Sequence, residues 1–569
     1  MNQVIKSAVA AVCLISASII SQAQTSKTSK DEVPKGWHLM DKAKDGYNGI
    51  SINEAYEFVK SKNLKSSPVI VAVIDSGIDT LHEDLKPILW TNEKEIAGNK
   101  KDDDGNGYVD DVHGWNFIGG KDGRNVTKDS YEGARVYHKL KEKYQGKTVD
   151  TALLKGDSLE EYKTWLRAKG RVEGDSQESS GMDLSMMKRV LTSAQKGDSI
   201  LRESMKKDTF TGNDLDTFTA TNAAEKAAKG GLVYLFRANN MMETTNVEFL
   251  QGLGEFIENE ERKAQSSETA PPEYRKDIVG DNEADINDKY YGNNDIMATT
   301  PLHGTHVAGI IGAVRNNNKG MDGVADNVRI MMIRAVPDGD EHDKDIALAI
   351  RYAVDNGAKV VNMSFGKDFS PEKEWVDDAV KYAASKNVLL VHAAGNDGKN
   401  IDSADNFPNA TLKATASRAT NWITVGASGD LKAGGLTASF SNYGKTEVDV
   451  FAPGVRIYST VPGGNTYANL QGTSMASPVV AGTAAFLMSY FPDLTAEQVK
   501  EVIEKTATSP GDTANLPGTG DDVKFSELSK TGGVINAVEA AKLAYTLQPE
   551  TKQKRNRRTP KSVLKNEQL

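Results

Sequence analysis

The chain has 569 residues, of which 38% are hydrophobic, and its formal net charge is −10. A sequence of this length and composition is able to bury a large core, and length alone suggests about two to four domains. The acidic balance argues against general nucleic-acid binding, which needs a basic surface.

Residues 1–23 have the pattern of a secretory leader. Lys6 precedes an apolar run of small residues from Ser7 to Ile20, and Ser21-Gln22-Ala23 fits a signal-peptidase site. The run is too short for a transmembrane span, and polar residues follow it at once. We therefore expect export to a secreted or periplasmic location, with no stable membrane span in the remaining chain.

The cysteine content indicates that disulfides do not hold the exported chain together. Cys13 is the only cysteine, and it lies inside the leader. Disulfides stabilise many extracellular proteins, so a chain without them needs another source of stability. Bound metal ions are the obvious candidate.

Strand-like and helix-like runs alternate from residue 69 onward, after a short polar N-terminal segment at 24–64. Such alternation predicts an α/β fold, with a parallel sheet and helices on both faces. The apolar, β-branched runs that we expect to be strands are 69–75, 328–336, 359–365, 387–395, 422–428 and 448–454. We place this domain at 65–545.

An acidic loop at 101–117 is a candidate calcium site. Its pattern matches the first two-thirds of an EF-hand loop, with Gly107 allowing the sharp turn. Closely spaced carboxylates repel one another unless a cation neutralises them. A solvated acidic loop is the alternative. The predicted ligands are Asp102, Asp104, Asn106, the Tyr108 carbonyl, Asp110 and Asp111, with Asp111 replacing the usual glutamate because His113 holds the twelfth position.

The stretch 125–272 is predicted to be a mostly helical insertion in the α/β domain. Ser158 and Glu161 have the spacing of a capping box, and Gly170 is the expected stop of that helix. Apolar residues recur at helical spacing in two later runs, Leu184, Met187 and Leu191, then Leu250, Leu253 and Ile257. A role in gating access for a substrate is one hypothesis for this insertion.

Three segments bring reactive side chains to the ends of predicted elements. Asp75 ends the strand at 69–75, His303 opens a helix of small residues, and Ser474 begins another. An acid, an imidazole and a hydroxyl are the groups that nucleophilic catalysis uses: the serine attacks, the histidine takes its proton and the aspartate orients the histidine. A lone serine at such a place would be an N-cap, but the other two segments favour catalysis.

The sequence resembles the subtilisin-like serine peptidases, or subtilases. The motifs AVIDSGID, HGTHVAG and GTSMASP carry the three residues in the Asp, His, Ser order of that group. Two further landmarks, VVNMSFG at 360–366 and VHAAGND at 391–397, fall in sequence order. The resemblance covers about 65–90 and 296–545 and implies a subtilisin-like sheet flanked by helices, with the insertion between the aspartate and the histidine.

The resemblance implies roles for further residues. Asn396 would donate a hydrogen bond to the oxyanion, together with the Ser474 backbone N–H. His306, one helical turn after His303, is expected to pack beside the site rather than act as a second base. The substrate would add as a strand to 364–366. The implied substrate-binding residues are Ser364, Phe365, Gly366, Ala394 and Gly395.

Further acidic segments are candidates for calcium or for substrate contacts. Subtilases commonly hold calcium at an aspartate after the first motif and at a loop after the histidine helix, a layout that Asp84 and the loop 315–320 match. The run 281–295 is a third candidate site. The acidic loop 337–345 would border the substrate cleft and favour Lys or Arg two to four residues before the cut, although a merely soluble loop is the alternative.

We interpret the chain as an exported, calcium-stabilised serine endopeptidase that acts on proteins or peptides through an acyl-enzyme. One rival is a pseudo-protease whose insertion binds a partner, and another is a dedicated processing enzyme. The oligomeric state stays open. The tail at 546–569 is expected to be an exposed, disordered end, because 552–565 carries seven Lys or Arg and no acid. Contact with anionic lipid, polysaccharide or nucleic acid is the alternative for this tail.

Overall fold

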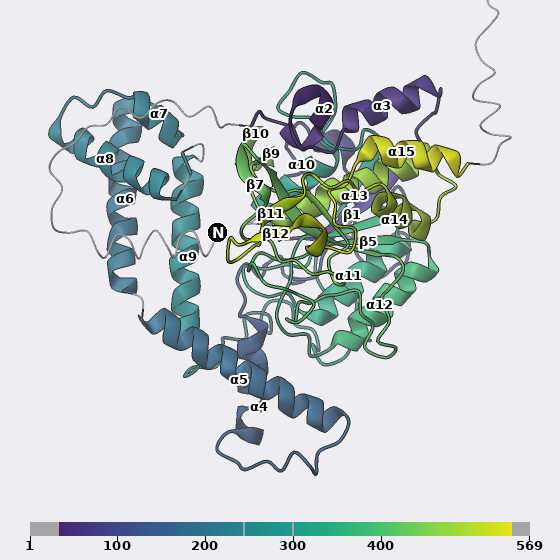
Figure 1. Ribbon diagram of the computed structural model, residues 1–569. Coiled ribbons are helices and arrows are strands. Elements are labelled where there is room, and N and C mark those ends of the chain that lie inside the picture. The colour runs from purple at the N-terminus through teal and green to yellow at the C-terminus, as the bar shows by residue number, and fades with distance from the viewer. Residues whose placement is uncertain (1–32, 182, 240, 243–244, 299–300, 549–569) are drawn as a thin grey trace, which may run out of the picture. The chain divides into compact units, whose positions relative to one another are not determined.

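The computed structural model describes residues 33–181, 183–239, 241–242, 245–298 and 301–548, and it divides into two compact units. One unit is the segment 130–272, and the other contains the described residues on either side of that segment. Figure 1 labels helices and strands of both units where there is room. The predicted leader and most of the predicted basic tail lie outside the described residues. Within those residues, no helix is both long enough and apolar enough to cross a membrane.

The larger unit is built on an eight-stranded sheet with the order β2-β3-β1-β4-β5-β6-β7, in which β8 also pairs with β6. All of these pairs are parallel except the one between β6 and β7. The strands are β1 (Val69–Asp75), β2 (Gly114–Asn116), β3 (Val328–Arg334), β4 (Val360–Met363), β5 (Leu389–Ala393), β6 (Trp422–Asp430), β7 (Ala433–Thr437) and β8 (Val450–Pro453). The predicted α/β fold class is confirmed.

Alternating side chains of β1 enter two different cores, because successive residues of a strand point to opposite faces. Val71 and Val73 belong to a core that includes residues of α10 (Leu302–Gly312) and α13 (Thr473–Tyr490). Ala72 and Ile74 belong to a core that includes residues of α11 (Asp343–Asp355) and α12 (Lys373–Ser385). Both faces of the sheet are thus covered, which explains why its strands are apolar without alternation.

Several smaller elements complete this unit. They are η2 (Lys86–Ile88), β9 (Ile457–Val461), β10 (Thr466–Leu470), α14 (Ala496–Lys505), β11 (Thr513–Asn515), β12 (Asp522–Lys524), η3 (Phe525–Glu527) and α15 (Ala537–Thr546). β9 pairs with β10, and β11 with β12, as antiparallel two-stranded sheets. α15 is the last helix of the described residues.

The segment before β1 packs into the same core instead of standing apart from it. It forms η1 (Trp37–Leu39), α2 (Lys42–Asp45) and α3 (Ile52–Ser61). Trp37 is fully buried, and its indole N–H donates to the Val455 carbonyl at 3.1 Å. Burying a tryptophan and bonding its N–H anchors this segment firmly.

The inserted unit, 130–272, is helical as predicted. It contains α4 (Glu132–Tyr144), α5 (Asp157–Gly181), α6 (Leu184–Met205), α7 (Gly212–Thr217), α8 (Ala223–Ala238) and α9 (Asn246–Gln265). Met187, Leu253 and Ile257 lie in its core, as their helical spacing predicts. This core is separate from those of the sheet unit, so the insertion has its own hydrophobic centre.

The predicted end of the helix at Gly170 is wrong, because α5 continues to Gly181. Ser158 is also not a cap, since it lies inside α5 and its hydroxyl donates to the Lys155 carbonyl. The buried residues Trp165, Ala168 and Val172 continue one helical stripe on both sides of the glycine. Packing of that stripe outweighs the cost of about 1 kcal/mol for a glycine within a helix.

Candidate active site

Asp75 and His303 form the first contact of the predicted triad. Asp75 ends β1 and is 1% exposed, while His303 is the second residue of α10 and is half-buried. The His303 Nδ1 lies 2.8 Å from Asp75 Oδ1 and 3.0 Å from Oδ2. Burial alone would lower the pKa of His303, but the Asp75 carboxylate outweighs it and raises that pKa. A carboxylate at Nδ1 leaves Nε2 as the basic nitrogen.

Gly304 explains how α10 comes close enough to β1 for this contact. A Cβ atom at that position would lie 2.1 Å from the Gly77 carbonyl oxygen and 3.2 Å from the Asp75 Cβ. Neither atom is able to move far, since the oxygen belongs to the backbone and the Cβ begins a buried side chain. The glycine after the histidine therefore permits the close approach that the pair requires.

Ser474 lies in the first turn of α13 and is joined to Ser364 in both directions. The Ser474 hydroxyl donates to the Ser364 carbonyl at 3.1 Å, and the Ser364 hydroxyl donates to the Ser474 carbonyl at 2.9 Å. Pro478 has no N–H to offer the carbonyl four residues earlier, which is that of Ser474. The Ser364 hydroxyl takes the freed acceptor and fixes the start of α13 against the end of β4.

The described contacts of Ser474 include no hydrogen bond to His303. The two residues nevertheless lie at the carboxyl end of the sheet: His303 contacts the last residue of β1, and Ser474 contacts Ser364, just after β4. β1 and β4 are neighbouring parallel strands. Catalytic hydrogen bonds are often long without substrate, and rotation of the serine side chain would turn its oxygen away from Ser364.

Asn396 lies beside the start of α13. Its side-chain oxygen accepts from the Thr473 N–H at 2.8 Å and from the Thr473 hydroxyl at 2.9 Å. The other end of the amide, Nδ2, is 3.6 Å from the position of a Cβ on Gly472. Holding the oxygen in this way leaves the N–H₂ group as a fixed donor next to the Ser474 backbone N–H, which lies in a turn where helices leave N–H groups unpaired.

A cavity of about 220 Å³ lies beside Ser474. Its walls come from residues 364–368 after β4 and from residues at 393–397 at the end of β5, with Asn406 and Thr473. Of the predicted substrate-binding residues, the structure places Ser364, Phe365, Gly366 and Gly395 in this wall. Ala394 is buried outside it, and Ala393 lines the cavity instead.

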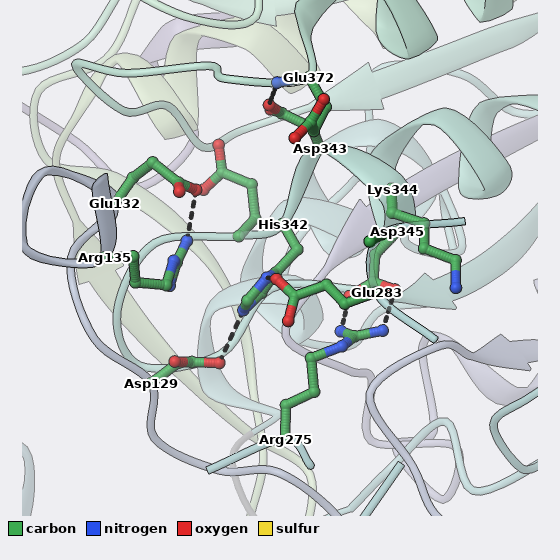
Figure 2. Close-up of polar contacts among 12 residues, drawn as sticks. Asp129, Glu132, Arg135, Arg275, Glu283, His342, Asp343, Lys344, Asp345 and Glu372 are labelled. Atoms are coloured by element: carbon green, nitrogen blue, oxygen red, sulfur yellow. Dashed lines mark hydrogen bonds and ion pairs between the residues drawn. The ribbon is translucent and has the colours of Figure 1, made fainter. Parts of the chain in front are cut away.

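The expected acidic rim at 337–345 is contradicted over 341–345, because this half of the loop is buried and ion-paired. Glu341 is 2% exposed and Asp345 is fully buried. Asp345 pairs with Arg275 and accepts the Tyr291 hydroxyl at 2.5 Å, while Lys344 pairs with Asp281 at 2.6 Å. Figure 2 shows Arg275 facing Asp345 at the start of α11. These acids stabilise the loop internally and are not available to attract a substrate.

His342, also in this loop, lies between two carboxylates in Figure 2. Its Nε2 is 3.0 Å from Asp129 and its Nδ1 is 2.6 Å from Glu283. Asp281 of the candidate site 281–295 pairs with both Lys344 and Arg275. Side-chain cations of the protein therefore already neutralise Asp281, which needs no metal ion.

The loop 101–117 brings Asp102 and Asp104 together and adds Glu95, which the sequence analysis missed. One oxygen of each of the three lies within 4.8 Å of the others. Glu95 is 9% exposed; its Oε1 accepts from the N–H groups of Asp103 and Asp104, but its Oε2 is buried without a hydrogen-bond partner among the described residues. A buried carboxylate oxygen needs a partner, so this group fits a hard cation such as calcium.

The other predicted ligands of this loop lie outside that group. Asp110 accepts from the N–H groups of Gly98 and Lys100 at 2.9 and 2.7 Å. Asp111 is fully buried and accepts from the Tyr352 hydroxyl at 2.6 Å, and burial raises its pKa to about 6. Its further partners are the side-chain amides of Asn92 and Asn106. Tyr108 packs in an aromatic cluster with Trp115, Phe117 and Tyr352.

Asp84 and the loop 315–320 meet, as their predicted common site requires. Asp84 is fully buried, and its Oδ1 accepts from the Asn317 amide at 2.5 Å. Its Oδ2 accepts from the Tyr467 hydroxyl at 2.7 Å. Both oxygens therefore have protein donors, in contrast to Glu95.

Comparison with known proteins identifies the family. The family model described as the subtilase family matches residues 66–525. The chain belongs to the subtilase family. It is 42% identical over 233 residues to a thermophilic serine proteinase of Bacillus sp. (strain AK1), an alignment that covers 41% of this chain and 52% of that protein. It is 39% identical over 211 residues to subtilisin DY of Bacillus licheniformis, which covers 37% and 72% respectively.

A solved protease structure from Pseudoalteromonas arctica is also similar to this subtilase, with 30% identity and a TM-score of 0.35, over 44% of this chain and 74% of that one. The chain spans about half the length of the thermophilic proteinase. Subtilases are serine peptidases with an Asp-His-Ser triad, and Asp75, His303 and Ser474 stand in that order along this member.

Proposed function

We propose that this subtilase is an exported serine endopeptidase that hydrolyses peptide bonds through an acyl-enzyme and is stabilised by calcium. The observation that carries the proposal is the His303–Asp75 contact at the sheet edge where α13 presents Ser474. Membership of a peptidase family and the nearby cavity support it. Export follows from the leader pattern in residues 1–23, and protein or peptide segments are the substrate class.

In the proposed reaction, Ser474 Oγ attacks the carbonyl carbon of the scissile bond and His303 Nε2 takes the hydroxyl proton. Asp75 holds Nδ1 and stabilises the imidazolium that forms. The Asn396 amide and the Ser474 N–H donate to the oxyanion. His303 then protonates the leaving amine, and water hydrolyses the acyl-enzyme by the reverse sequence. The bond lost is the C–N bond, and its carbonyl is released as a carboxylate.

Hydrolysis of a denatured protein, followed by mass spectrometry of the products, tests the proposal. Cleavage at internal bonds by the purified chain is expected, and absence of cleavage under every folding-competent condition would favour the pseudo-protease. A processing enzyme would cut few sites in such a substrate, whereas a general endopeptidase would cut many.

The pH profile of kcat/KM follows from the raised pKa of His303. The base must be neutral to take the serine proton, so activity is expected to rise with pH through a value above the ordinary 6.5 of histidine. Initial rates on a short peptide between pH 5 and 9, with circular dichroism to verify folding at each pH, measure this. A rate that stays constant down to pH 5 in folded protein would contradict the assignment of His303.

Calcium removal is expected to lower the melting temperature. Glu95, Asp102 and Asp104 would hold the ion, and binding to the native state alone at 100 times Kd stabilises by about 2.7 kcal/mol, which amounts to several °C. Melting curves of the inactive Ser474→Ala protein with chelator and with excess calcium test this without self-digestion.

A Glu95→Gln variant is expected to lose most of the calcium-dependent shift. Asp103→Asn is a matched control, because Asp103 lies in the same loop and its side chain accepts hydrogen bonds from Ile96 and Asn99, outside the three-carboxylate group. Equal calcium shifts in the Glu95 variant and its parent would refute this site.

A further inference from the structure

The cavity beside Ser474 has a defined place in the proposed reaction. It is lined by Ser474, which attacks, and by Asn396, which holds the oxyanion. A substrate carbonyl bound between these two groups brings the side chain of its own residue to the cavity. The walls therefore decide which residue is accepted immediately before the scissile bond.

Two carboxylates line this cavity, and one ammonium pairs with both of them. Asp368 and Asp397 belong to its lining, with side chains 31% and 57% exposed. Lys399 lies between them, with Nζ 2.8 Å from Asp368 Oδ1 and 3.2 Å from Asp397 Oδ2. Two negative charges against one positive charge leave the group with one unit of negative charge.

A lysine in the cavity wall does not offset that charge at the cavity. Lys367 has a side chain only 1% exposed, and its ammonium donates to the Glu341 carbonyl at 2.8 Å and pairs with Asp343 at 2.9 Å. Its charge is thus directed to the buried loop at the start of α11. The sequence alone shows alternating charges in this stretch and does not reveal which of them face the cavity.

The cavity also offers a hydrogen-bond acceptor near two glycines. The side-chain oxygen of Asn406 lies 3.6 Å from a Cβ placed on Gly366 and 3.4 Å from one placed on Gly395. Both glycines line the cavity, and because glycine has no side chain, this oxygen stays within reach of a substrate side chain. Lysine and arginine donate hydrogen bonds and accept none, which matches carboxylates and an amide oxygen.

We propose that this cavity selects lysine or arginine in the residue before the scissile bond, with Asp368 and Asp397 as the specificity-determining residues. The inference rests on the proposed peptidase function. Lys399 bridges the two carboxylates in the free protein, and the substrate's cation joins or displaces it. Selectivity thus comes from a paired acidic site that keeps one unbalanced charge.

Peptides that differ only in this residue, Arg, Lys, Leu or Glu, test the proposal at low salt. We expect Asp397→Asn and Asp368→Asn each to lower the Arg-to-Leu ratio of kcat/KM roughly fivefold, the ratio that about 1 kcal/mol of exposed ion pairing provides. Lys399→Gln is expected to raise that ratio, because it removes the competing cation. Asp378→Asn is a matched control with an exposed Asp–Lys pair on α12 and should leave the ratio unchanged.

The outcomes separate this inference from the peptidase function. If the wild type cleaves no peptide, the proposed function fails. If it cleaves but prefers Glu, Lys399 recognises the substrate and this proposal is overturned. A lower Arg-to-Leu ratio in Lys399→Gln also overturns it, because the ammonium would then not compete with the substrate's cation. One further check uses the wild type alone and therefore does not depend on the folding of any variant. Its preference for Arg over Leu is expected to shrink as salt rises, and an unchanged ratio would also count against the proposal.

Discussion

Replacing Ser474 by alanine is expected to lower kcat by about 10⁶-fold, the size of the loss known for removing the nucleophile of subtilisin, a relative of this chain. No other group takes over the attack, because the three triad residues act as a unit. The fold should persist, since the change removes one hydrogen bond to the Ser364 carbonyl, worth about 1 kcal/mol. Initial rates on a peptide substrate measure the loss.

Ser489→Ala provides a control for this experiment. Ser489 lies near the other end of α13, and its hydroxyl donates to the Ser67 carbonyl at 2.7 Å. Its variant also loses one hydroxyl and one hydrogen bond, but it should retain activity within about tenfold. Comparable turnover by pure, folded Ser474→Ala protein would refute the serine assignment.

Acidification is expected to unfold the sheet unit, because three fully buried histidines are neutral in the native state. Burial lowers the pKa of His38 and His306 to about 3 and that of His392 to about 4. In the unfolded chain each would titrate near 6.5, so the unfolded state gains protons first as pH falls. The free energy of unfolding should therefore be highest above pH 6.5 and decrease below it, by about 6 kcal/mol at pH 5 for three such groups.

Urea unfolding of the Ser474→Ala protein at pH 7, 6 and 5, followed by tryptophan fluorescence, measures this decrease. His38 is the sharpest single test, because neither of its ring nitrogens has a hydrogen-bond partner in the described structure. For each unit that pH falls below 6.5, the free energy of unfolding of His38→Leu should increase by about 1.4 kcal/mol relative to that of its parent. Parallel pH curves for the two proteins would show that His38 does not carry the effect.

The positions of Asp75, His303 and Ser474 were predictable because chemistry and secondary structure coincide at those residues. An apolar strand that ends in Asp75 and helices that begin near His303 and Ser474 bring all three to the carboxyl edge of one parallel sheet. The link between Ser474 and Ser364 was not predictable. It depends on Pro478 freeing a carbonyl for a hydroxyl from a segment 110 residues earlier.

Charged loops were the least predictable part of the candidate sites. The sequence shows the acids at 337–345, but it does not show that Arg275 and Asp281 form ion pairs with this loop. Both residues follow the insertion in the sequence. Glu95 was missed for a related reason. It precedes the acidic loop 101–117 in the sequence, whereas an EF-hand pattern contains only residues within the loop.

Mass spectrometry after labelling with a fluorophosphonate tests the central claim most directly. Ser474 Oγ should attack phosphorus, with fluoride leaving, and form one stable adduct on the peptide that contains Ser474. The same adduct should be absent from Ser474→Ala and should form far more slowly in His303→Ala. A chain that hydrolyses peptides but is labelled at another residue, or is not labelled, would contradict the account.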